Sequence, residues 1–177
     1  HSAANGVCTP LRQKNVDTGM GLERVRAVLE GKPSVYETDL FLPLLEETQS
    51  RTGLPVRNHP REIQILCDHI RAVTFLLGDP HAVAPSNTEQ GYVIRRLIRR
   101  VLRILNRLGT APDGLQKLCE NVIVHYSGLY PELLQNKNAV LTHLEHETAV
   151  FGRTLQSGLK QAEKLFCGMQ TGELVSG

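Results

Sequence analysis

Hydrophobic positions recur every three or four residues along most of the chain, which is the spacing of amphipathic α-helices. Segments rich in glycine and proline separate these stretches and predict the breaks between helices. Alternation of the strand type is scarce, so the fold class we predict is mainly α, a helical bundle with a long C-terminal helix. The expected helices cover residues 22–29, about 40–50, about 60–77, about 86–108, 115–126 and 131–166.

The last of these helices is expected to be the longest. No proline follows Pro131 before Phe166, and an apolar stripe of near-heptad spacing runs through this part of the chain. The pattern predicts one continuous helix of about 35 residues, or a rod of roughly 50 Å.

The helix predicted after Pro85 has the clearest division into two faces. At about 100° per residue, six arginines fall within an arc of roughly 140°, together with Tyr92 and Asn106. Apolar side chains occupy the opposite half, so one face suits a protein core and the other an anionic partner. The arginines are Arg95, Arg96, Arg99, Arg100, Arg103 and Arg107.

No acidic residue stands among positions 91–112, so the charge of this face is not neutralised within its own helix. The arginines either pair with glutamates elsewhere in the fold or bind nucleic-acid phosphates, and we favour phosphate binding to RNA or DNA. A helix lying on a membrane would need its apolar face in lipid, whereas the neighbouring helices need that face for the core. We therefore expect no membrane partner.

Ser86 and Glu89 stand three residues apart at the start of this helix, which is the spacing of a capping box. If Ser86 is the N-cap, the amide of Asn87 is free at the helix N-terminus to read a base edge in an RNA minor groove. Alternatively, Asn87 is itself the cap, since asparagine is favoured there, and it then reads no base.

A second candidate site is the segment N-V-D-T-G-M-G-L-E-R at residues 15–24. Gly19 and Gly21 permit a ligand to approach the backbone closely, and Arg24 lies in the first turn of a helix, where an arginine can hold a phosphate. The carboxylate of Asp17 can pair with a substrate ammonium group. The alternative is a plain turn, since most G-x-G pairs are no more than that.

Composition narrows the function classes. Aromatic residues make up 5% of the 177 residues, with no Trp, which argues against a base-stacking RNA-recognition sheet. The formal net charge is only +2, so a nucleic-acid surface must come from local clustering. Four widely spaced cysteines form no C-x-x-C pair, and neither an apolar run of 18 residues nor a signal-peptide pattern occurs. We expect a reducing, cytoplasmic location.

His143 and His146 lie three residues apart on one helix face, with Glu147 four residues from His143. A metal site needs at least a third ligand, and no matching cluster is apparent in the sequence. We interpret this face as solvated and expect no metal site.

Taken together, residues 15–24 and the arginine helix resemble the alanyl-tRNA synthetases. Residues 15–24 are similar to the family's form of motif 3 of the class II synthetases. Further segments recur in the family in the same order, at residues 28–29, 36–41, 68–72 and 85–100. The resemblance covers nearly the whole chain and implies an enzyme that activates alanine with ATP and transfers it to tRNA(Ala).

The resemblance also implies two parts with different roles. Residues 1–38 would be the C-terminal remnant of the antiparallel α+β catalytic domain, in which Arg24 contacts ATP phosphate, Gly19 and Gly21 line the adenylate pocket, and Asp17 receives the alanine ammonium group. Residues 39–177 would be the helical tRNA-recognition domain, in which Asn87 matches the asparagine that reads the G·U pair of the acceptor stem. The other expected tRNA-binding residues are Tyr92, Arg95, Arg96, Arg99, Arg100 and Arg103.

Several features of the family pattern are missing from this chain. They are motifs 1 and 2, the editing domain with its zinc site, the oligomerisation region and the aspartate that is the second G·U reader; Gln90 also stands where a basic residue is usual. ATP and Mg²⁺ would serve the intact enzyme, and we expect no cofactor, no zinc and no activity in this piece alone. Its expected partners are the tRNA(Ala) acceptor stem and the remainder of the synthetase. The alternative is a non-catalytic paralogue acting as an RNA-binding or interaction module.

Overall fold

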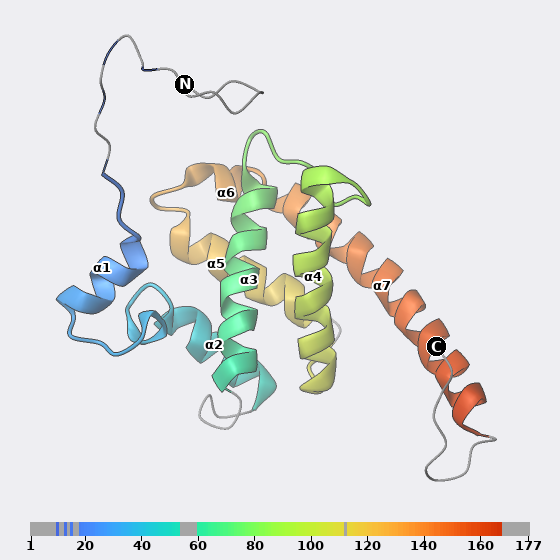
Figure 1. The fold of residues 1–177 in the computed structure, drawn as a ribbon. Helices are drawn as coiled ribbons and strands as arrows, with labels where there is room; N and C mark the ends of the chain where they lie inside the picture. The colour runs from blue at the N-terminus through green and yellow to red at the C-terminus, as the bar shows by residue number, and fades with distance from the viewer. Residues whose placement is uncertain are drawn as a thin grey trace. The chain divides into compact units, whose positions relative to one another are not determined.

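The computed structural model describes residues 10, 13, 15, 18–53, 60–111 and 113–167, and every regular element within these ranges is a helix (Figure 1). The mainly α fold class is therefore confirmed, and no strand occurs in the described ranges. The chain divides into two compact units, His1–Leu40 and Phe41–Gly177.

The first unit contains one α-helix and one short 3-10 helix. Helix α1 (Leu22–Leu29) has the predicted bounds, and η1 (Val35–Glu37) begins where the Ser34 hydroxyl accepts a hydrogen bond from the Tyr36 N–H at 3.3 Å. Ala27 is the only buried residue of α1. Four large apolar side chains in and beside α1 are exposed: Met20, Leu22, Val28 and Leu29. The described residues of this unit thus form little core of their own.

The second unit is a bundle with α3 at its centre. Helix α3 contacts each of the five other helices, and Figure 1 shows α3 and α4 side by side with α5 crossing behind them. Its buried positions Ile63, Leu66, Ile70, Val73 and Leu77 repeat every three to four residues, as the sequence pattern predicts. The helices are α2 (Leu42–Thr52), α3 (Pro60–Gly78), α4 (Glu89–Arg107), α5 (Gly114–Tyr126), α6 (Pro131–Gln135) and α7 (Lys137–Phe166).

The prediction of one helix over residues 131–166 is wrong, because Asn136 separates α6 from α7. The Asn136 side chain donates from Nδ2 to the carbonyl oxygen of Gly78 at 2.9 Å, and so satisfies a backbone group at the end of α3. The short α6 places Leu133 against Gly78, where a Cβ would stand 2.5 Å from the Leu133 side chain. The break therefore lets α6 close over the end of α3.

Helix α7 extends beyond the other helices of this unit (Figure 1). Its buried residues, Val140, Leu144 and Glu147, all lie in its first half, whereas Leu159 and Phe166 are exposed. The apolar stripe predicted for this helix therefore continues past the packed core. None of the described helices combines the length and the apolar character needed to cross a membrane.

Candidate nucleic-acid interface

The loop between α3 and α4 folds back against the first turn of α4. The Ser86 N–H donates to the carbonyl oxygen of Gly91 at 3.1 Å, and Gly91 is buried. A Cβ at Gly91 would stand 2.5 Å from the carbonyl oxygen of Ala84 and would also meet the Ser86 hydroxyl. Glycine at this position thus allows the backbone of the loop to pack directly on α4.

Neither of the two predicted caps starts α4. Its N-cap is Thr88, and no side chain caps the helix. Ser86 instead closes a local turn, because its Oγ accepts from the Thr88 N–H at 3.3 Å and donates to the Thr88 carbonyl at 2.9 Å. Glu89, the first residue of α4, has a left-handed φ of 48°, which turns the chain at the start of the helix. Asn87 is exposed and is not the cap.

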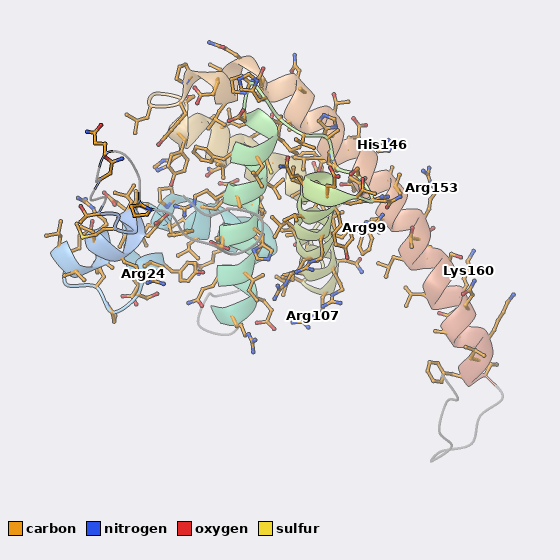
Figure 2. All side chains as sticks on the ribbon, turned by 45° about the horizontal axis from the view of Figure 1, so that its top comes forward. Arg24, Arg99, Arg107, His146, Arg153 and Lys160 are labelled. Atoms are coloured by element: carbon orange, nitrogen blue, oxygen red, sulfur yellow. The ribbon has the colours of Figure 1, made fainter. Side chains whose placement is uncertain are left out.

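Two of the six arginines face α7. The Nε atoms of Arg95 and Arg99 lie 3.1 Å and 3.6 Å from Oε2 of Glu147, a carboxylate that is only 3% exposed. The Arg99 guanidinium also lies over the ring of Phe151 at 5.7 Å, and Figure 2 shows Arg99 at the boundary between α4 and α7. Arg95 additionally donates to Oδ1 of Asn87. Of the two interpretations of the arginines, pairing with a glutamate elsewhere in the fold therefore applies to Arg95 and to Arg99.

The other arginines of α4 point to solvent. Arg107 forms an ion pair with Glu62 of α3. Arg96, Arg100 and Arg103 are exposed, and nothing within the described ranges joins any of them by a hydrogen bond or an ion pair. These three residues form a surface that we name the open arginine face. They span an arc of about 60° and a rise of roughly 10 Å along one side of the helix.

Tyr92 lies beside the open arginine face, one turn before Arg96, and is 49% exposed. Asn87 lies at the N-terminal end of the same helix. The structure thus places an exposed amide at the N-terminal end of α4, against Arg95, and places along the helix a phenol and three cations that have no partner among the described residues. Such a surface can bind phosphates along a strand while one polar group contacts a base edge or a ribose hydroxyl.

The histidine face of α7 provides no metal site in the part of the chain that the structure describes. No group of three His, Cys, Asp or Glu side chains there could hold a metal ion. Glu147 points into the contact with α4, and His146 lies along the outer side of α7 with Arg153 and Lys160 (Figure 2).

In the first unit, the structure describes part of the predicted ATP site. Gly21 is the N-cap of α1 with extended backbone, Gly19 has open space around its Cα, and Arg24 is exposed in the first turn of the helix (Figure 2). An exposed guanidinium beside a glycine backbone fits a contact with a phosphate of ATP. Asp17 lies outside the described residues.

Two residues of the interface were not predicted from the sequence. The histidine spacing predicts a solvated position for Glu147, but this residue stands in the apolar stripe between Leu144 and Phe151, where a charge needs a buried partner. Gly91 lies within the segment 85–100 that resembles the family. A glycine inside a strongly amphipathic helix signals a close backbone approach, and that signal was available in the sequence.

Comparison with known proteins gives the family of the chain. The model of the family described as tRNA synthetases class II (A) matches residues 1–177. The alanine–tRNA ligase of Treponema pallidum is 43% identical over 165 residues, covering 92% of this chain and 27% of that protein. The alanine–tRNA ligase of Thermus thermophilus is 39% identical over 173 residues, covering 97% of this chain and 19% of that protein.

The chain therefore spans only a small part of the relatives that it matches, between 18% and 28% of their length. The relatives are named alanine–tRNA ligases, and the family match extends over the full chain. The chain belongs to the family of class II (A) tRNA synthetases.

Proposed function

We propose that this chain is part of an alanine–tRNA ligase and that its helical unit binds the acceptor stem of tRNA(Ala). The intact enzyme would activate alanine with ATP and transfer it to the tRNA. The observation that carries the proposal is the open arginine face, because Arg96, Arg100 and Arg103 are exposed and have no partner in the described chain. The names of the relatives, alanine–tRNA ligases, support alanine and tRNA as the substrates in this proposal.

The open arginine face holds the phosphate backbone in this proposal. A guanidinium can form two parallel hydrogen bonds with a phosphate, so three of them along α4 fix the register of an RNA strand. Tyr92 supports the same strand from the side. Arg95 and Arg99 contribute less to phosphate binding, since Glu147 already compensates much of their charge.

Asn87 reads the G·U pair in this proposal. It is exposed at the N-terminal end of the helix that holds the backbone, so a stem bound along α4 brings a base pair to the amide. The wide, shallow minor groove of an RNA helix presents base edges and 2′-hydroxyls to such a group.

The first unit belongs, in this proposal, to the α+β catalytic domain of the intact enzyme. The exposed apolar side chains Met20, Leu22, Val28 and Leu29 support this assignment, because a larger domain would cover them. Arg24 contacts an ATP phosphate, Gly19 and Gly21 line the adenylate, and Asp17 receives the alanine ammonium group. Mg²⁺ would accompany ATP in the intact enzyme. The chain alone is expected to be inactive, and measurable ATP–pyrophosphate exchange by the purified chain would contradict that expectation.

The experiment that tests recognition of the G·U pair compares two RNA hairpins that are identical except at one base pair, which is G·U in one hairpin and G·C in the other. The wild-type chain should prefer the G·U hairpin, and Asn87→Ala should abolish the preference. The control is Asn106→Ala, which removes the same side chain from an exposed position near the other end of α4. Equal binding of the two hairpins by the wild type would favour a non-catalytic interaction module.

A further inference from the structure

One guanidinium joins the proposed base reader to the buried side of the bundle. Arg95 donates from Nη1 to Oδ1 of Asn87 and from Nε to Oε2 of Glu147 at 3.1 Å. Asn87 is 8 residues away in the chain and Glu147 is 52 residues away, on α7. A single side chain of α4 thus connects the loop before the helix with a separate helix of the fold.

Glu147 is placed to hold this connection firmly. The residue is 3% exposed, whereas the side chain of Arg95 is 17% exposed. A buried carboxylate is costly unless charged hydrogen-bond donors surround it, and Arg95 and Arg99 both approach the same Oε2. An apolar side chain at this position would pack without that cost. A buried ion pair is weak support for stability, so a role in positioning is the better account of this carboxylate.

The connection determines which end of the Asn87 amide is available. A guanidinium carries only donors, so the amide oxygen of Asn87 must be the atom that faces Arg95. The NH₂ group of Asn87 is then left for a ligand, and it offers two donors. Such a group suits acceptors in an RNA minor groove, namely pyrimidine O2, purine N3 or a ribose oxygen, and it does not suit another amino group.

We propose that Glu147 is a positioning residue for base recognition, acting through Arg95 to hold the Asn87 amide with its NH₂ group toward the RNA. This inference rests on the proposed role of Asn87 as the reader of the G·U pair. Glu147 itself touches no RNA. Its contribution is to keep the Arg95 fork in one orientation, and thereby to fix the orientation of the amide.

The test uses the 177-residue chain and the G·U and G·C hairpins. Loss of one good base contact changes discrimination by about 5- to 150-fold, which is the effect expected for Asn87→Ala. Glu147→Gln should lower the preference by at least about fivefold within that range, while affinity for the G·C hairpin stays within about twofold. The control is Glu145→Gln, an exposed glutamate of the same helix, which should leave the preference unchanged.

Arg95→Lys is the second variant, because it keeps the charge but removes the fork that reaches both partners. It should also lose the preference, whereas Arg153→Lys, at an exposed position of α7, should keep it. The double variant Asn87→Ala with Glu147→Gln should lose no more of the preference for the G·U hairpin than Asn87→Ala alone, since Glu147 acts through Asn87. A merely structural role would weaken both hairpins equally and leave their ratio intact.

A measurement without RNA completes the test. The ¹⁵N–¹H resonances of the Asn87 side-chain amide in the free chain should shift in Glu147→Gln and stay in place in Glu145→Gln. An unchanged Asn87 amide, or a Glu147→Gln chain that retains the wild-type preference, would overturn the positioning role alone. A wild-type chain without any preference would instead overturn the proposed function of Asn87.

Discussion

The carbonyl oxygen of Ala84 lies so near Gly91 that a Cβ on Gly91 would stand only 2.5 Å from it. This approach fixes the loop that carries Asn87 against the first turn of α4. The position of the proposed base reader is therefore determined by backbone packing at Gly91 and by the hydrogen bond from Arg95.

Replacing Gly91 by alanine should displace this loop. Overpacking of this kind costs about 1–3 kcal/mol, so we expect the free energy of unfolding of Gly91→Ala to fall by that amount. The preference for the G·U hairpin should fall as well, because Asn87 moves with the loop. Urea unfolding and hairpin titration measure the two effects.

The matched control is Gly158→Ala in α7, where a Cβ meets nothing within 4 Å. Alanine in an open helical position should raise the free energy of unfolding by about 0.5–1 kcal/mol. Equal stability of Gly91→Ala and the wild type would show that the loop does not pack on α4 as described.

The left-handed backbone of Glu89 gives a second prediction. A left-handed conformation costs an L-residue roughly 1–2 kcal/mol, and glycine avoids that cost. Since glycine also gains freedom in the unfolded chain, we expect Glu89→Gly to raise the free energy of unfolding by about 0.5–1 kcal/mol net. Glu89→Gln keeps the strained φ and should stay within about 0.5 kcal/mol of the wild type.

Both Glu89 variants remove a negative charge from the N-terminal end of α4, the helix that carries the open arginine face. Both should therefore bind RNA more tightly at low salt, and the gain should shrink as salt screens the charge. A Glu89→Gly chain that is less stable than Glu89→Gln would contradict the left-handed conformation.

The buried thiols give a third prediction, on alkaline stability. Burial raises the pKa of Cys67 and of Cys119 from 9.0 to about 12, and an opposing contribution to the pKa of Cys67 comes from the Thr48 hydroxyl at 3.7 Å. Between pH 9 and 12 the unfolded chain therefore binds fewer protons than the folded chain at these two sites. Stability should fall as pH rises through this window, by up to about 1.4 kcal/mol per pH unit for each thiol.

Urea unfolding at pH 8, 9, 10 and 10.5 measures this dependence. Lysines and tyrosines titrate in the same range, so the thiol contribution is the difference between the wild type and the variant Cys67→Ala with Cys119→Ala. The exposed Cys167 serves as the control through Cys167→Ser. If the stability of the wild type and of the double variant changed with pH in parallel, the contribution of the two buried thiols would be refuted.

Much of the fold follows from local pattern, and the deviations arise from contacts between distant residues. Apolar spacing bounded by glycine and proline predicts α1 and α3 to within about a residue. The break at Asn136 depends on a hydrogen bond to Gly78, 58 residues away, which periodicity cannot reveal. The N-cap of α4 is Thr88, and the next residue, Glu89, has a left-handed backbone that a residue with a side chain does not favour.

At the candidate site, too, local pattern predicts part of the arrangement and contacts between distant residues determine the rest. The helical repeat places six arginines on one face but cannot say which of them have partners. The partners come from distant parts of the chain: Glu147 is 52 residues from Arg95, and Glu62 is 45 residues from Arg107. Among the described residues, Arg96, Arg100 and Arg103 have no such partner. The charge that the sequence predicts for a helix face is thus an upper limit on the charge that a ligand encounters there.

The most direct test of the central proposal is the salt dependence of hairpin binding. Replacing Arg96, Arg100 and Arg103 by glutamine should reduce the slope of log affinity against log salt by about 1 for each arginine that contacts a phosphate. The control replaces Arg153, Lys160 and Lys164 of α7, which removes the same charge from exposed positions and should leave the slope nearly unchanged. An open arginine face that holds the acceptor stem predicts a loss of slope only in the α4 variant. Equal slopes in the α4 variant and the wild type would contradict it.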